Sequence, residues 1–151
     1  MKENRDWGSA LAEIRMWARQ GLEDDVAVMA NIVAQIRLLW PEWTWIGFYR
    51  VWHLSQDLMV GPFSGPPSPL TIAWGEGVIG SCAAERAVQI VGSIKKFPGY
   101  IAAVPQTHSE VSLPIIRNSH VYAVLDCQSP EVDGIDLEAI EWLGEVAQTL
   151  S

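Results

Sequence analysis

Two acidic residues in the last third of the chain, Glu110 and Asp126, are placed where they can bind one positively charged or amide group together. Each belongs to a run rich in β-branched and apolar residues, and the runs 110–116 and 121–127 are separated by a short polar segment, which is typical of a β-hairpin. Neighbouring carboxylates on a half-apolar surface can accept hydrogen bonds from an ammonium or amide donor. The alternative is a solvated outer face of a one-sided sheet.

The register of this hairpin decides what surrounds the two carboxylates. A two-residue turn pairs Glu110 with Cys127 and mixes polar and apolar side chains on both faces. A three-residue turn shifts the pairing by one residue, so that Glu110 faces Gln128 and Ser112 faces Asp126. Because a shift of one residue moves every side chain to the other face, we expect the register that gives one wholly apolar face, formed by Val111, Leu113, Ile115, Ala123, Leu125 and Cys127. The polar residues then share the other face with Pro114, Ile116, Tyr122 and Val124.

A glycine-rich motif offers a second kind of chemistry. Residues 75–80 (Gly-Glu-Gly-Val-Ile-Gly) match the GxGxxG spacing of dinucleotide-binding turns. Such turns need a parallel βαβ unit and an acidic residue about twenty positions later. Lys95 and Lys96 stand in that region instead, so we expect a tight turn from a strand into a helix.

The cysteines and histidines suggest no site of their own. Cys82 and Cys127 are too few for a disulfide framework, and there is no CxxC pair for zinc. No sequence signal places His53, His108 or His120 beside either cysteine. We therefore expect no metal site and no cofactor.

The segments that position these residues alternate between helical and extended patterns. Apolar residues recur at helical spacing over residues 9–20, 26–39 and 135–150, and a short helix is expected at 78–86. Strands are expected at residues 44–52, 58–63, 70–74, 88–91, 110–116 and 121–127. Short turns between neighbouring strands predict an α+β fold with a mainly antiparallel sheet and the terminal helices on one face. The long segment 93–108 is expected to cover the other face.

The composition excludes several functions. A length of 151 residues suits one domain. The net charge of −8 and the scattered basic residues argue against binding nucleic acid. The chain contains no apolar run long enough to span a bilayer and no secretory signal pattern, so we expect a cytoplasmic protein that does not bind membranes. Four of the eight tryptophans lie within residues 40–52. We expect them to pack in the core, to line an aromatic pocket or to form an interface.

Six motifs follow one another along most of the chain: Trp45-Ile-Gly-Phe-Tyr, Gly61-Pro-Phe-Ser-Gly, Gly75-Glu-Gly-Val-Ile-Gly, Phe97-Pro-Gly-Tyr-Ile-Ala, Ser109-Glu-Val-Ser-Leu-Pro and Val124-Leu-Asp-Cys-Gln-Ser-Pro. Together they resemble the free-methionine-(R)-sulfoxide reductases, which are stand-alone GAF domains. The similarity covers residues 24–150 of what we expect to be one domain over residues 1–151. The resemblance implies a six-stranded antiparallel sheet, with helices on one face and a loop-covered ligand cavity on the other.

The sequence also departs from this family. The reductases use cysteines at the positions that are Pro69, Ile79 and Ala103 here, and they have a histidine at the position of Tyr100. None of the three residues can supply the thiolate that attacks the sulfoxide sulfur. The acidic residues that anchor the ligand in the family are kept at Glu110 and Asp126, but a second aspartate is replaced by glutamine.

We therefore expect a non-catalytic GAF domain that binds a small polar, amino-acid-like ligand. Glu110 and Asp126 would anchor a donor group of the ligand. The neighbouring polar residues and the apolar walls would come from Ser112, Gln128, Trp45, Tyr49, Ile79 and Tyr100.

Two alternatives stay open. Cys82 lies about one helical turn after Ile79 and could support a residual methionine-(R)-sulfoxide reductase that uses an external reductant. The chain could instead be a regulatory or structural homodimer module with a vestigial cavity. The tryptophan-rich segment and the amphipathic terminal helices would then supply its interface.

Overall fold

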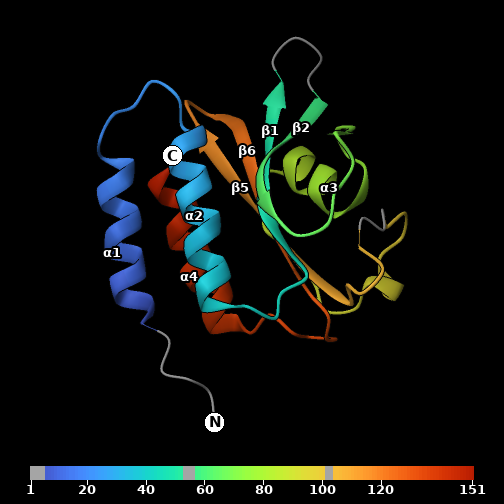
Figure 1. The fold of residues 1–151 in the computed structure, drawn as a ribbon. Helices are drawn as coiled ribbons and strands as arrows, with labels where there is room; N and C mark the ends of the chain where they lie inside the picture. Colours follow the sequence, from blue (N-terminus) through green and yellow to red (C-terminus); the bar gives the residue numbers. More distant parts are fainter. Residues whose placement is uncertain (1–5, 53–56, 101–103) are drawn as a thin grey trace.

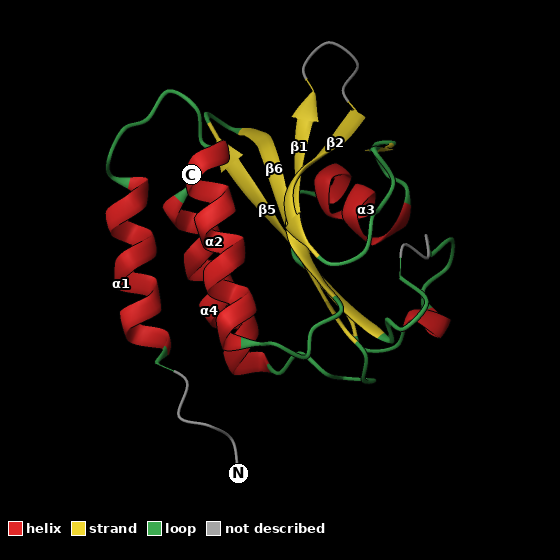
Figure 2. Cartoon of the chain, in the orientation of Figure 1, coloured by secondary structure: helices red, strands yellow, loops and turns green. Residues whose placement is uncertain are grey.

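The computed structural model describes residues 6–52, 57–100 and 104–151. Within them lie the helices α1 (Trp7–Ala18), α2 (Val26–Leu39), α3 (Gly77–Glu85) and α4 (Leu137–Thr149), and the short 3-10 helix η1 (Ile94–Lys96). The strands are β1 (Trp45–Trp52), β2 (Asp57–Ser64), β3 (Thr71–Ile72), β4 (Gln89–Val91), β5 (Ser109–Arg117) and β6 (His120–Ser129). They form one antiparallel sheet in the order β3-β2-β1-β6-β5-β4. Helices α1, α2 and α4 lie on one side of it and α3 on the other (Figures 1 and 2), as an α+β fold predicts.

Capping side chains set where α1 and α4 begin. α1 begins two residues before the predicted start, because the Asp6 carboxylate accepts a hydrogen bond from the Ser9 backbone N–H at 3.0 Å. In α4, Asp136 accepts one from the Ala139 N–H at 2.9 Å in the same way. α2 ends at Leu39, as the following Trp40-Pro41 pair predicts. No helix among the described residues is long and apolar enough to cross a membrane.

The main hydrophobic core lies between the sheet and the three outer helices. The six residues of the predicted apolar face of the hairpin all belong to it. Aromatic rings close one end of this core: Trp40 stacks on Trp43 with ring centroids 4.4 Å apart, and the Trp142 N–H donates to the Trp7 carbonyl at 2.9 Å. Packing of the core therefore accounts for these four tryptophans.

The hairpin has the predicted register, but the predicted three-residue turn is wrong. The turn has two residues, Asn118 and Ser119, which both adopt positive φ angles of 49° and 66°. This geometry is that of a type I′ turn, whose twist matches the twist of two antiparallel strands. The register is shifted by one residue between Ile115 and Ile116, where a β-bulge inserts an extra residue into β6.

The bulge also moves Tyr122, which was predicted on the polar face of the hairpin. Its ring packs against the core on the opposite side of the sheet. Its hydroxyl donates a hydrogen bond at 3.0 Å to Asp25, at the start of α2. Beyond the bulge Glu110 faces Gln128 and Ser112 faces Asp126, as predicted.

The glycine motif forms the tight turn that joins β3 to α3. Gly75 and Gly77 have φ angles of 86° and 64°, and a Cβ atom on Gly80 would lie 2.6 Å from the Ala73 carbonyl oxygen. Because β3 runs antiparallel to β2, the motif is not part of a parallel βαβ unit. The strand predicted at 70–74 is reduced to two residues, since the turn begins at Ala73, whose carbonyl bonds the Glu76 N–H.

Candidate functional site

Four polar residues are buried on the side of the sheet that faces α3. They are Glu110 and Ser112 on β5 and Asp126 and Gln128 on β6, and none is more than 3% exposed. A second apolar cluster, from β1, β2, β3, α3 and β6, lies on this side of the sheet. The alternative of a solvated outer face is therefore wrong for these four residues. Buried polar groups need hydrogen-bond partners, and those partners define the site.

Asp126 is the centre of the polar network. Its Oδ1 accepts a hydrogen bond from the Ser112 hydroxyl at 2.5 Å, and its Oδ2 accepts one from the Gln128 amide at 2.9 Å. The Gln128 carbonyl oxygen in turn accepts from the Thr107 hydroxyl, which lies 2.7 Å from the hydroxyl of Thr44. Both hydrogen-bonding ends of Gln128 are thus used inside the protein, and its amide is held in one orientation.

Glu110 lies against Asp126, and their side chains share a hydrogen bond. Burial raises the pKa of Glu110 well above its ordinary value, and the negative charge of Asp126 raises it further. Burial also raises the pKa of Asp126, but hydrogen bonds from Glu110, Ser112 and Gln128 oppose that change because they favour the ionised form. We therefore assign the shared proton to Glu110 and the negative charge to Asp126.

Tyr100 covers the outer side of this carboxyl pair. Its hydroxyl donates a hydrogen bond to Glu110 Oε1 at 3.1 Å. Burial and the nearby carboxyl groups raise the pKa of Tyr100, so its phenol keeps its proton. The predicted covering segment thus contacts the polar residues at two points, Tyr100 on Glu110 and Thr107 on Gln128.

A small cavity adjoins the polar network, between β1, β5 and α3. Its volume is about 20 Å³, which is room for a few water molecules at most. Five of the predicted residues line it: Trp45, Tyr49, Ile79, Glu110 and Gln128. Asp126 and Ser112 lie behind the cavity as hydrogen-bond partners rather than in its wall.

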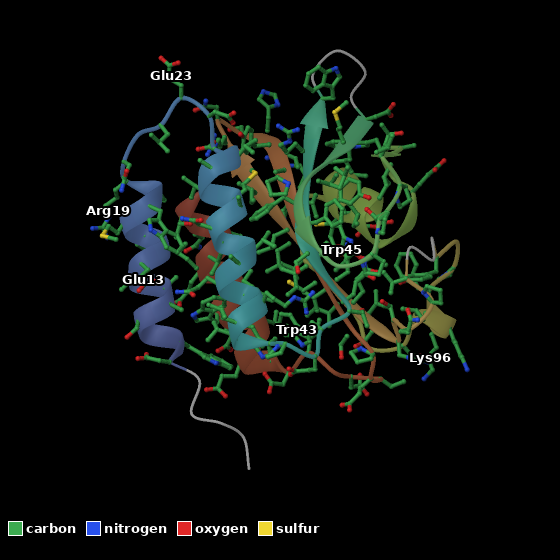
Figure 3. The ribbon with its side chains drawn as sticks, viewed as in Figure 1. Glu13, Arg19, Glu23, Trp43, Trp45 and Lys96 are labelled. Carbon is green, nitrogen blue, oxygen red and sulfur yellow. The ribbon has the colours of Figure 1, made fainter. Side chains whose placement is uncertain are left out.

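Trp45 forms one wall of the cavity and is only 1% exposed. Its ring stacks on Phe63 with centroids 5.5 Å apart, and Figure 3 shows it on the α3 side of the sheet. Gly47 and Gly65 leave room for the ring, since a Cβ on either would lie within 3 Å of a Trp45 atom. The buried Trp45 indole N–H has no hydrogen-bond partner among the described residues. A buried donor without a partner is costly and marks a place where a ligand acceptor fits.

The sequence interpretation missed the part of the lining that comes from two loops. Ser68 and Pro69 lie over Tyr49, whose hydroxyl is 2.8 Å from the Ser68 hydroxyl and donates to the Pro69 carbonyl at 2.6 Å. Residues 76–78, at the start of α3, complete the wall. The proline-rich stretch and the glycine motif were the available signals, but neither indicates which way its side chains point.

The positions where the resemblance implies cysteines can now be placed. Pro69 and Ile79 both line the cavity, whereas Ala103 lies outside the described residues. Cys82 is fully buried in the cluster beneath α3, where burial and the charge of Asp126 raise the pKa of its thiol. Cys127 is buried on the helix side of the sheet, as the predicted register requires. In residues 6–52, 57–100 and 104–151, no three His, Cys, Asp or Glu side chains are close enough to share a metal ion.

Comparison with known proteins agrees with this geometry. The GAF domain family model matches residues 22–151. Protein YtsP of Bacillus subtilis is 35% identical over 84% of this chain and 78% of its own length. Free methionine-R-sulfoxide reductase of Saccharomyces cerevisiae is 32% identical over 87% of this chain and 79% of its own length.

A solved structure of free methionine-R-sulfoxide reductase from Neisseria meningitidis, in complex with its substrate, has the same fold. It superposes with a TM-score of 0.89 at 30% identity and covers 95% of this chain and 85% of that chain. The family match, the likeness in fold and the sequence similarity over most of the chain agree with one another. The chain therefore belongs to the GAF domain family and is related to the free methionine-R-sulfoxide reductases.

Proposed function

We propose that this chain is a GAF domain that binds a small amino-acid-like ligand in the cavity between Trp45 and Glu110, without reducing a sulfoxide. The observation that carries the proposal is the buried Trp45 N–H, which lacks a partner among the described residues of a cavity that also contains a carboxyl pair. One wall thus offers a hydrogen-bond donor and the other offers acceptors. A ligand with both an acceptor oxygen and an ammonium group complements the two walls.

The carboxyl pair favours a ligand with one positive charge. Glu110 and Asp126 share one proton, so together they carry one negative charge. An ammonium group of the ligand can donate hydrogen bonds to this pair while the shared proton stays in place, so that one positive charge lies against one negative charge. Gln128 adds no charge, and its amide is already bonded to Asp126 and Thr107. The net charge of the pair therefore favours a ligand with a single ammonium group.

Binding requires Tyr100 to give up its hydrogen bond with Glu110. The cavity of about 20 Å³ is smaller than any amino acid, and the Tyr100 hydroxyl occupies one acceptor position of Glu110. A ligand ammonium that takes this position replaces one hydrogen bond with another of greater strength, because the new donor is charged.

Two observations argue against thiol chemistry in this cavity. Its wall has carbon side chains, Pro69 and Ile79, where the resemblance implies cysteines. The nearest thiol, Cys82, is fully buried, and its raised pKa keeps it protonated and therefore a poor nucleophile. A reductase that works through Cys82 would need this thiol exposed and ionised.

The test combines calorimetric titration and a coupled assay. L-Methionine-(R)-sulfoxide and L-methionine are the probes, and thioredoxin or dithiothreitol is the reductant. We expect binding without turnover, and a loss of affinity of roughly tenfold in Trp45→Phe, which removes the indole N–H. Trp43→Phe is the matched control, because Trp43 is buried on the other side of the sheet.

Three results would contradict the proposal. If neither probe binds, the proposed amino-acid-like ligand is wrong. If the wild type and Trp45→Phe bind the probes with equal affinity, the indole N–H does not contribute to binding. Turnover that disappears in Cys82→Ser would establish the reductase alternative.

A further inference from the structure

A groove lies at the far end of the strands that carry the polar network. In the pairing of β1 with β6, Trp45 and Gln128 are at one end, and Arg50 and Ala123 are near the other. The groove beyond that second end has a volume of about 590 Å³, which is within the range of small-molecule sites. Its lining residues are Val51, Trp74, Arg86, Arg117, His120, Val121 and Tyr122. None of them lines the cavity beside Glu110.

The groove is basic, although the chain carries a net charge of −8. Arg86, Arg117 and His120 line it, and no acidic residue is among the lining residues. Arg117 is already engaged, since its guanidinium lies 2.6 Å from the Asp25 carboxylate and 3.9 Å from the centre of the Tyr122 ring. Arg86 and His120 have no side-chain partner among the described residues, so their donors are available to a ligand.

The backbone at Arg86 is held in an unfavourable conformation. Arg86 follows the last residue of α3 with a φ of 56° and a ψ of 38°, which is the left-handed region. Glycine is the usual residue at this position of a helix end, because a side chain there clashes with the backbone. An arginine at such a position costs stability and directs a guanidinium to the groove.

The rest of the groove is apolar and aromatic. Trp74, in the turn before α3, is 42% exposed, so much of its ring is open to solvent at the groove. Val51 and Val121, from the adjacent ends of β1 and β6, belong to the lining beside it. A flat ring can therefore pack on Trp74 while a negative group on that ring reaches Arg86.

We propose that this groove is a second binding site, for a small aromatic anion whose negative group binds Arg86 and whose ring packs on Trp74. The volume and the separate basic and apolar parts both favour a small molecule. The proposal does not rest on the proposed function, because the two sites share no lining residue.

The test compares two fluorescent dyes with the same ring system. Anilinonaphthalene sulfonate is anionic, and phenylnaphthylamine is uncharged. We expect the wild type to bind the sulfonate more tightly by roughly fivefold or more. Arg86→Gln should remove this preference while leaving the affinity for phenylnaphthylamine unchanged, and Arg86→Lys should retain part of it. Trp74→Leu should weaken the binding of both dyes.

Two further variants separate binding from folding. Arg86→Gly removes the charge and relieves the left-handed backbone, so the preference should disappear while Tm rises by about 2–4 °C. Arg19→Gln, at the end of the outer helix α1 (Figure 3), removes a charge far from the groove. It should leave the affinity for both dyes unchanged. A preference that survives in Arg86→Gln would overturn the proposal. An equal loss of affinity for both dyes in Arg86→Gln would also overturn it, as would unchanged binding of the dyes to Trp74→Leu.

Discussion

The side chains of Glu110 and Asp126 hydrogen-bond to each other in the interior of the protein, although both are acids. The contact is stable only while one of them keeps a proton, because two buried carboxylates repel each other. Asp126 has the larger number of hydrogen-bond donors, and Glu110 is the one with the more strongly raised pKa. This arrangement makes the stability of the protein depend on pH.

The first prediction concerns Glu110→Gln. In the folded state the pKa of Glu110 lies above the ordinary value of 4.5, so its stabilising contribution is fully present below that value and is lost as the pH rises through the raised pKa. Glutamine can still donate to Asp126 and accept from Tyr100, but it does not titrate. We expect Tm of the variant to match the wild type near about pH 4 and to exceed it near about pH 9.

Thermal unfolding followed by circular dichroism across this pH range measures the effect. Glu141→Gln, on the exposed face of α4, is the matched control and should follow the wild type at every pH. A wild-type Tm that is the same as that of Glu110→Gln at alkaline pH would show that Glu110 is ionised without cost.

The second prediction concerns the thiols. Cys82 and Cys127 are both fully buried, and burial raises the pKa of each. Iodoacetamide reacts with thiolates that it can reach, so we expect the folded protein to remain unlabelled while the chain unfolded in guanidinium chloride takes up two labels. Mass spectrometry counts the labels. Rapid labelling of Cys82 in the folded protein would contradict the buried, protonated state.

The third prediction concerns the space around Trp45. A Cβ on Gly47 would lie 2.4 Å from the Phe63 Cβ and 2.6 Å from a Trp45 ring atom, so Gly47→Ala should destabilise the fold by about 1–3 kcal/mol. It should also displace the indole that lines the cavity. Gly144→Ala is the control, because nothing lies within 4 Å of a Cβ there, and alanine in α4 should stabilise by roughly 0.5–1 kcal/mol. Chemical denaturation measures both, and similar effects of the two substitutions would refute the steric explanation.

The fourth prediction concerns Arg37, which joins the end of α2 to the end of β2. Its guanidinium donates to the Ser64 hydroxyl and carbonyl, each at 3.0 Å, and to the carbonyls of Pro41 and Trp43 at 3.2 and 2.5 Å. Lysine cannot reproduce these directed bonds, so Arg37→Lys should lower the free energy of unfolding by about 1–3 kcal/mol. Arg19→Lys, on the exposed end of α1, should change it by less than about 0.5 kcal/mol. Equal effects would show that charge alone matters at position 37.

Much of the fold could be predicted because its signals are periodic and strong. The helical spacing of apolar residues in α2 and the Pro41 that follows it set that helix within the predicted bounds. The apolar alternation in β5 and β6 was enough to select their register, since only one pairing gives a uniformly apolar face. Helical spacing and strand alternation both arise because one face of each element is buried, and this burial selects apolar residues at regular intervals in the sequence.

The details of the site depend on geometry that the sequence does not record. The bulge that moves Tyr122 to the other face leaves no pattern of its own, because any residue can occupy such a position. The hydrogen bond of Tyr100 with Glu110 joins a loop to a strand, and no periodicity relates the two segments. The unpaired N–H of Trp45 follows from the packing of Phe63 and two glycines around one ring.

The β-bulge between Ile115 and Ile116 separates the hairpin turn from the polar network. The two-residue turn at Asn118 and Ser119 sets one alignment of the strands, and the bulge resets that alignment before the strands reach Ser112 and Asp126. Without the bulge, the same two-residue turn would place Glu110 opposite Cys127 and bring polar side chains to the helix-covered face of the sheet. The one extra residue in β6 is therefore what keeps Ser112 and Asp126 on the same face as Glu110, and its deletion would turn the carboxyl pair apart.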